Sequence, residues 1–194
     1  MEKSWIDSLN EAQRQSLKTR LSDKEAAALL YDWAASTGRE KQEKNALGGA
    51  AFTATPAGFY QFDSGRMYRQ YHSTTWDQDM PYAMFFNWQR EGVQTGLAIH
   101  AAGGDDIARL GQRASAGCVH LAPENARILF DLVKIEYRGQ VPRFSIDADD
   151  TMSAKGKFSR RTDGSLRMAE GYRVLVDIEN YGGADGGEDA VALF

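Results

Sequence analysis

The residues best suited to covalent chemistry lie in one short stretch of the chain. The 194-residue sequence contains a single cysteine, Cys118, which directly follows Gly117. His100 precedes this cysteine, and His120 follows it by two residues. A thiol attacks a carbonyl carbon as the thiolate, so it needs a base or a positive environment that lowers its pKa from about 8.5. The stretch is therefore a candidate site for nucleophilic catalysis.

An inert cysteine is the competing interpretation. A lone cysteine is more often a small buried hydrophobic residue than a nucleophile, and a histidine at the end of an apolar strand is more often structural. His120 shares a face with Cys118 if the segment is extended, so it is an alternative base, a substrate contact or a structural residue. His72 has no motif around it and is expected to be structural.

The backbone around the cysteine is suited to binding an oxyanion. Gly117 lacks a side chain, so a substrate can approach the main chain closely. The N–H groups of Gly117 and Cys118 are candidates for an oxyanion hole, which stabilises a tetrahedral intermediate. The loop from His100 to Cys118 also carries charged residues, namely Asp105, Asp106, Arg109 and Arg113.

The elements that position these residues are mostly strands. Short aromatic and β-branched runs separated by Gly, Pro and Asp predict a sheet or sandwich. These runs cover residues 51–55, 58–62, 66–71, 82–88 and 96–100. A helix is expected from Pro123 to about residue 134, because Pro suits the first turn and Glu124 complements its positive end. Alternating valines and Ile178 predict a further strand over residues 172–178.

The N-terminal part of the sequence has a helical pattern instead. Residues 22–25, Ser-Asp-Lys-Glu, form a capping-box motif. Apolar residues then recur at helical spacing as far as Trp33, and Gly38 is the expected end of this helix. The charged residues 39–44 are expected to form a solvated helix end or a linker.

Composition argues against several classes of protein. The formal net charge is -4 and the pI about 5.4, whereas nucleic-acid binding needs clustered Lys and Arg. No apolar run approaches the roughly 18 residues of a membrane span. One cysteine cannot form an intramolecular disulfide. The histidines and aspartates show no recognised metal-ligand spacing, so neither a metal nor another cofactor is expected.

Four segments, in this order, carry a family resemblance. Thr55-Pro56-Ala57-Gly58-Phe59-Tyr60 and Met80-Pro81-Tyr82 match two strand motifs. His100 is followed by 14 residues and then by Ser115-Ala116-Gly117-Cys118-Val119-His120, and residues 121–133 match a helix that follows the cysteine. Together they resemble the catalytic domain of the L,D-transpeptidases (YkuD-type). The family has His where this chain has Ala116, and usually Arg where it has His120.

The resemblance implies a fold and a division of the chain. The expected fold is mainly β with helices (α+β), built as a β-sandwich catalytic domain over residues 48–145. An N-terminal helical segment, residues 1–47, would precede it. A C-terminal extension, residues 146–194, would follow it with one strand and a flexible acidic tail.

The resemblance also implies roles for individual residues. Cys118 would be the nucleophile and His100 its base, with the Gly117 and Cys118 N–H groups as oxyanion hole. Ala101 offers no side-chain acceptor, so a backbone carbonyl is expected to orient His100. The expected substrate contacts are Ser115, His120, Arg113, Arg109 and Tyr82. Arg109 or Arg113 would pair with a stem-peptide carboxylate.

The function implied is cross-linking of peptidoglycan stem peptides through a cysteine acyl-enzyme, with carbapenems as expected inhibitors. The alternatives are a peptidoglycan hydrolase on the same fold (carboxypeptidase, endopeptidase or amidase) and a catalytically silent wall-binding module. The silent module remains an alternative because Ala116 replaces the family's motif histidine. A papain-like or NlpC-type peptidase is disfavoured, because its cysteine precedes its histidine. The expected location is the periplasm or cell envelope, with a signal peptide already removed.

Overall fold

The computed structural model describes residues 33–180 and 190–193 of the chain. The described residues from Ala35 onward belong to one compact unit. The helices expected before residue 33 and the acidic tail expected at residues 182–189 lie outside the described residues. The limits expected for the catalytic domain, residues 48 and 145, remain a prediction.

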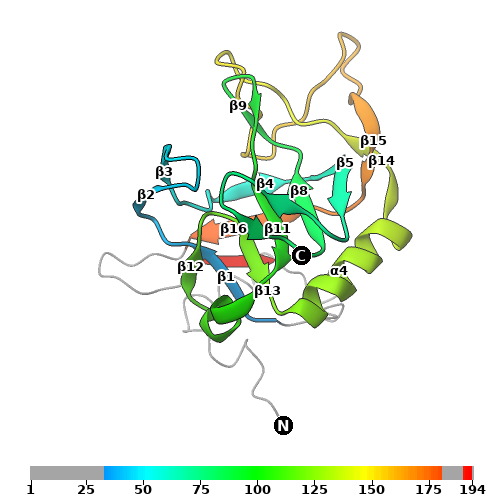
Figure 1. Ribbon diagram of the computed structural model, residues 1–194. Helices are drawn as coiled ribbons and strands as arrows, with labels where there is room; N and C mark the ends of the chain where they lie inside the picture. Colours follow the sequence, from blue (N-terminus) through cyan, green and yellow to red (C-terminus); the bar gives the residue numbers. More distant parts are fainter. Residues whose placement is uncertain (1–32, 181–189, 194) are drawn as a thin grey trace, which may run out of the picture. The chain divides into compact units, whose positions relative to one another are not determined.

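A six-stranded sheet forms the centre of this unit (Figure 1). Its strand order is β12-β1-β13-β11-β8-β5. The strands are β1 (Ala35–Gly38), β5 (Phe62–Tyr68), β8 (Ala83–Phe86), β11 (Ala98–Ala101), β12 (Arg113–Ser115) and β13 (Val119–Leu121). β11 runs parallel to β13 and antiparallel to β8, so the sheet is mixed. Every residue of β8, β11 and β13 is buried, as expected for strands covered on both faces.

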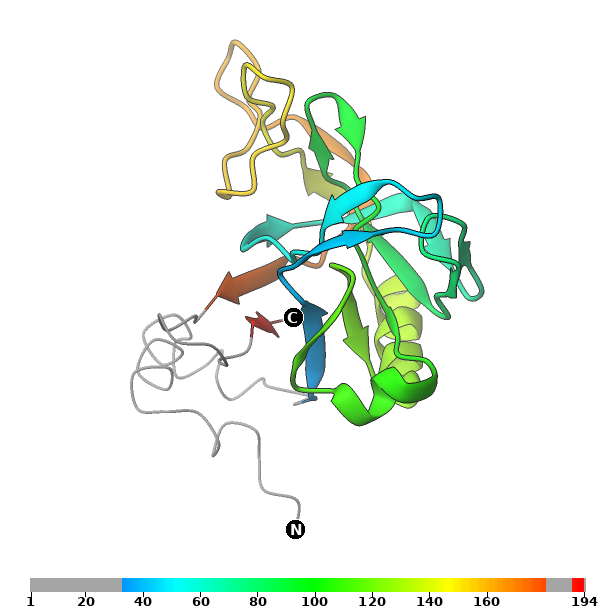
Figure 2. The same ribbon diagram turned by 60° about the vertical axis from the view of Figure 1, so that its left-hand side comes forward.

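Smaller sheets surround the central one. A three-stranded sheet has the order β17-β16-β4, and four two-stranded ribbons are β2–β3, β6–β7, β9–β10 and β14–β15. The bounds are β2 (Gln42–Lys44), β3 (Ala50–Phe52), β4 (Gly58–Tyr60), β6 (His72–Ser73), β7 (Gln78–Asp79), β9 (Gln89–Arg90), β10 (Val93–Gln94), β14 (Arg138–Pro142), β15 (Met168–Tyr172), β16 (Val176–Asn180) and β17 (Ala190–Leu193). The loops between β14 and β15 project from the sheet in both views (Figure 2).

One α-helix follows the cysteine segment, as predicted. Helix α4 (Pro123–Glu136) begins with proline and packs on β11 and β13. Its buried stripe is Ala126, Leu129, Phe130 and Val133. The mainly β fold with few helices is confirmed, and the other described helix is the 3₁₀ segment η1 (Gly104–Arg109).

The helix expected to end at Gly38 is wrong from residue 35 onward. Ala35–Gly38 is strand β1, between β12 and β13. Its partner residues are 76 to 86 positions away in the sequence, a pairing that local spacing does not reveal. The charged stretch 39–44 is not a simple linker either, because Gln42–Lys44 pairs with β3. The strand expected at 172–178 is two strands, β15 and β16.

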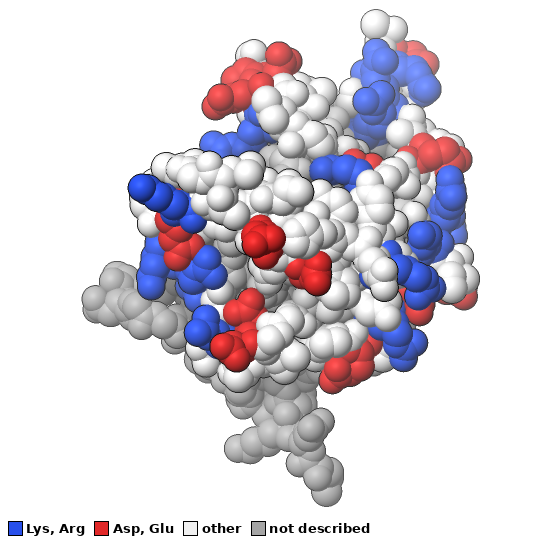
Figure 3. All heavy atoms as spheres, in the orientation of Figure 1, with Lys and Arg blue, Asp and Glu red and all other residues white. Residues whose placement is uncertain are grey.

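Charge is distributed as the composition suggests. On the face shown in Figure 3, basic and acidic side chains are mixed around the rim, and the largely uncharged middle carries a few acidic side chains. Within the described residues, no helix is long and apolar enough to span a membrane.

Gly38 is required by close packing, which gives a first prediction. A Cβ built there would lie 2.5 Å from Thr53 O and 2.8 Å from Thr55 N, both backbone atoms. Gly38→Ala should therefore lower the free energy of unfolding by about 1–3 kcal/mol, as overpacking does. Gly103→Ala is the control, because that site is open and extended (φ -121°). Equal urea midpoints for the two variants would contradict the packing argument.

Candidate active site

The register between β11 and β13 places three reactive side chains on one face of the sheet. His100 pairs with His120, and Ile99 with Val119. Cys118, one residue before β13, is therefore level with Ala98. Side chains alternate along strands, so Cys118 and His120 share a face, as do Ala98 and His100. The Cys118 side chain indeed packs against a cluster that includes Ala98 and Phe85.

His100 is held in the orientation that a general base needs. Its side chain is 2% exposed, and Nδ1 lies 2.9 Å from the carbonyl oxygen of Ala101. A carbonyl only accepts, so Nδ1 carries the proton and Nε2 keeps a free lone pair. This is the backbone acceptor that the sequence predicts. Burial, and next the neighbouring His120, lower the pKa of His100 to about 3, so the ring is neutral at pH 7.

Cys118 is a protonated thiol in the resting protein. Its side chain is half-buried, and Sγ lies 3.7 Å from the carbonyl oxygen of Gly96. Burial raises the pKa of Cys118 to about 11, although the Ala98 N–H acts in the opposite direction. No hydrogen bond joins Sγ to an imidazole among the described residues. The resting site is therefore a neutral thiol beside a neutral imidazole.

Two hydroxyl groups hold the loop that carries the cysteine. Ser115 Oγ donates to Cys118 O at 2.5 Å and accepts from the Gly117 N–H at 3.0 Å. Thr55 Oγ1 donates to Gly117 O at 2.6 Å and accepts from the Gly38 N–H at 2.8 Å. The loop is thus tied both to itself and to β1.

The backbone conformation at position 117 favours glycine. Its φ is +127°, and a Cβ would lie 3.0 Å from Ala54 O. Side chains disfavour such a φ. The Gly117 N–H, proposed as an oxyanion donor, is bonded to Ser115 Oγ at rest. Its use in catalysis would require Ser115 to release it.

His120 is a buried histidine with an unmet hydrogen bond. Its ring centroid is 4.4 Å from that of His100, and its side chain is 2% exposed. Nδ1 has no hydrogen-bond partner among the described residues, although Asp106 Oδ2 lies 3.7 Å away. Burial, and then the charge of Arg39, lower the pKa of His120 to about 4. A short movement of η1 would give this nitrogen a partner.

The other expected substrate contacts are distributed around this centre. Arg113 pairs with Glu40, whereas Arg109 is 55% exposed and lies 3.8 Å from Asp106. The Tyr82 ring packs edge-on against Phe130 of α4 at 5.9 Å. Ser115 is buried, with its hydroxyl engaged in the loop. Contact of these residues with substrate stays a prediction.

The sequence did not reveal that the residue after β1, Arg39, supports the segment before the cysteine. The Arg39 N–H donates to Ser115 O at 3.0 Å, and its guanidinium donates to Ala114 O at 2.6 Å. Thr55 was visible in the Thr-Pro motif, but its contact with Gly117 was not.

The fold and this grouping define a mainly β domain with a cysteine–histidine site. The L,D-transpeptidase catalytic domain (YkuD) matches residues 14–176. The chain therefore belongs to the L,D-transpeptidase catalytic-domain family. No curated protein matches the sequence significantly. Among solved structures, an L,D-transpeptidase (Yku) from Stackebrandtia nassauensis is similar at 16% identity and a TM-score of 0.33. That similarity spans 64% of this chain and 57% of the other.

The two buried histidines predict acid sensitivity. Both pKa values are lowered in the folded protein, from 6.5 to about 3 and about 4. Between roughly pH 4 and 6.5 the unfolded chain therefore binds more protons, and stability falls as pH falls. In this window, each histidine lowers the free energy of unfolding by about 1.4 kcal/mol for each unit by which the pH falls. His120→Gln lacks one of these histidines, so the pH dependence of its free energy of unfolding should be less steep by about this amount. Urea titrations at several pH values measure this dependence.

His72 provides the control for this experiment. It is exposed, and its hydrogen bond to Asp79 raises its pKa. Its contribution to stability is present below its unfolded pKa and lost at higher pH, so His72→Gln should not relieve acid sensitivity. An unchanged slope in His120→Gln would show that His120 titrates normally in the folded protein.

Proposed function

We propose that this protein is a peptidoglycan L,D-transpeptidase that cross-links stem peptides through an acyl-enzyme on Cys118. The observation that carries the proposal is the placement of Cys118 and His100 on one sheet face, with His100 Nε2 left as an acceptor. Family membership supports the acyl-transfer class. Both reactive groups are neutral at rest, so the nucleophile has to be generated during attack.

The first half-reaction transfers the donor acyl group to sulfur. Cys118 Sγ attacks a donor carbonyl while His100 Nε2 takes the thiol proton, giving a tetrahedral oxyanion. The Cys118 and Gly117 N–H groups are its proposed donors. The intermediate collapses when the C–N bond breaks, and imidazolium His100 protonates the leaving amine. A thioester and a free amino acid result.

The second half-reaction releases the product. The acceptor amine attacks the thioester carbonyl and His100 takes its proton. The C–S bond then breaks, and His100 returns the proton to sulfur. Arg109 is exposed beside this face, and we propose that it pairs with a stem-peptide carboxylate. The enzyme would work in the cell envelope, where peptidoglycan lies.

Two alternatives use the same fold. Water in place of the amine would make the protein a hydrolase, because the acyl-enzyme is common to both reactions. A silent wall-binding module is favoured by one observation, the raised pKa of a thiol that makes no hydrogen bond to an imidazole among the described residues. Product analysis separates all three.

The test is incubation with defined tri- and tetrapeptide muropeptides, followed by mass spectrometry. Cross-linked dimers are expected, whereas shortened or cleaved peptides alone would indicate a hydrolase. Cys118→Ala should abolish turnover with the fold intact, and His100→Ala should slow it at least about 100-fold, as loss of a general base does. His72→Ala, which changes an exposed histidine, should retain activity. Activity retained by Cys118→Ala would overturn the assignment of the nucleophile.

A further inference from the structure

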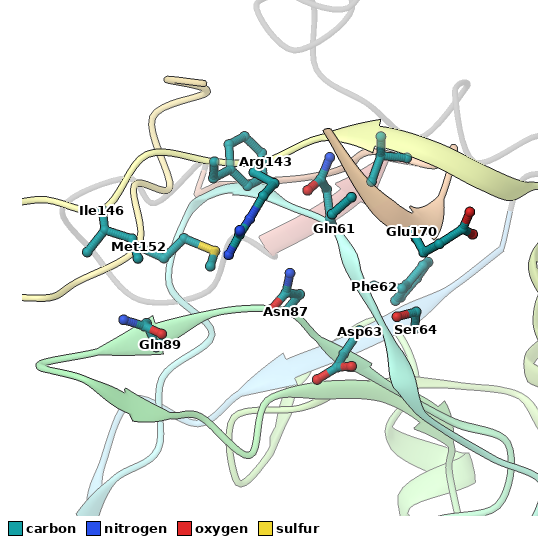
Figure 4. Close-up of a pocket in the computed structure, with 14 residues that line it drawn as sticks. Gln61, Phe62, Asp63, Ser64, Asn87, Gln89, Arg143, Ile146, Met152 and Glu170 are labelled. Carbon is teal, nitrogen blue, oxygen red and sulfur yellow. The ribbon is translucent and has the colours of Figure 1, made fainter. Parts of the chain in front are cut away.

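A concave site lies away from the cysteine, between the central sheet and the β14–β15 ribbon (Figure 4). Its volume is about 270 Å³. It is lined by the start of β5, by Asn87 and Gln89 after the end of β8, and by the chain around β14 and β15. That volume is slightly below the usual range for drug-sized ligands, about 300–1,000 Å³. It suits a ligand of one or two amino acids.

Arg143 supplies the positive charge of this pocket. Its main chain is fixed on both sides, because its N–H donates to Arg167 O and its carbonyl accepts from the Ser159 N–H, each at 2.8 Å. Within the described residues its guanidinium makes no hydrogen bond or ion pair. Figure 4 shows this side chain and Asn87 pointing toward one another across the pocket. An anchored backbone with an uncommitted guanidinium is suited to binding an anion.

The two carboxylates of the pocket have other partners. Asp63 accepts from Arg66 Nε at 2.7 Å and from the Gly65 N–H at 2.8 Å. Glu170 accepts from Gln140 Nε2 at 2.7 Å, and in Figure 4 it points away from Arg143. Neither carboxylate therefore neutralises Arg143.

The amides around Arg143 present acceptors. Gln61 Nε2 donates to Pro142 O at 3.0 Å, and Gln89 Nε2 donates to Asp150 O at 2.9 Å. Each amide oxygen is left to accept a bond. The Asn87 side chain offers both a donor and an acceptor. Phe144 and Met152 add apolar wall. The pocket thus combines one cation, amide acceptors and an apolar wall.

We propose that this pocket binds the free carboxyl end of a peptide, that is, an N-acylated amino acid with a free α-carboxylate. Arg143 pairs with the carboxylate in a bidentate manner, and amide oxygens of Gln61 or Asn87 accept the peptide N–H. The apolar wall receives a small side chain. This binding does not depend on thiol chemistry, so it is tested separately from the proposed function.

The pocket is connected to the nucleophile through the sheet. β8 and β11 pair with Ala98 opposite Phe85, and Thr95 N–H donates to Trp88 O. By this register Asn87 is level with Gly96, whose carbonyl contacts Cys118 Sγ. A peptide end held at Asn87 therefore lies beside the segment whose Gly96 carbonyl contacts the sulfur.

The test is an NMR titration of the full-length protein and of Cys118→Ala with N-acetyl-alanine, in both D and L forms. Saturable shifts at Asn87 and Gly171, with a millimolar Kd, are expected for one form in both proteins. N-acetyl-alaninamide and Arg143→Gln should each weaken binding about tenfold or more, because a charge-assisted pair is lost. Arg143→Lys should give an intermediate loss.

Arg138→Gln is the matched control, since it removes the same charge from β14 outside the pocket lining. It should leave the Kd unchanged. Equal affinity for acid and amide, an unchanged Kd in Arg143→Gln, or the absence of saturable shifts at these residues would overturn the proposal. Binding here with no turnover of muropeptides would reject the proposed function and keep this site.

Discussion

The site depends on the parallel pairing of β11 with β13. This pairing sets His100 beside His120 and brings Cys118 level with Ala98. Because side chains alternate, a slip of one residue would turn the sulfur and the imidazole to opposite faces. The apolar residues of the same strands resist such a slip, since Ile99, Val119 and Leu121 are fully buried. The packing of the core therefore fixes the geometry of the chemistry.

The second constraint is the resting charge state. Burial keeps both Cys118 and His100 neutral, which disfavours a preformed thiolate–imidazolium pair. In the proposed reaction, proton transfer therefore accompanies attack on the carbonyl, and we expect the rate to depend on how substrate binding changes the distance between sulfur and Nε2. Catalytic hydrogen bonds are often long in empty sites. The hydrogen bonds of Thr55 and Ser115 hold the backbone of the loop that carries the sulfur.

The cysteine–histidine pair was predicted from the spacing of a family motif, and its catalytic role stays a prediction. Local patterns predicted most of the strands and helix α4, because alternation and the residues that start a helix are features of neighbouring residues. They failed at β1, where Ala35 and Ser36 pair with Leu121 and His120. Such long-range pairing leaves no local periodicity. The approach of Asp106 to His120 and the pairing of Arg113 with Glu40 were hidden for the same reason. The family match confirms the class of domain and leaves the chemistry of this variant motif to experiment.

The most direct test is the intact mass of the protein during reaction with a carbapenem, whose ring opening acylates a nucleophile without releasing a fragment. The wild type should gain the full mass of one carbapenem, and Cys118→Ala should gain none. His100→Ala should react at least about 100-fold more slowly, because its proton acceptor is missing. A wild-type protein that stays unmodified, or a His100→Ala variant that reacts as fast as wild type, would contradict the account.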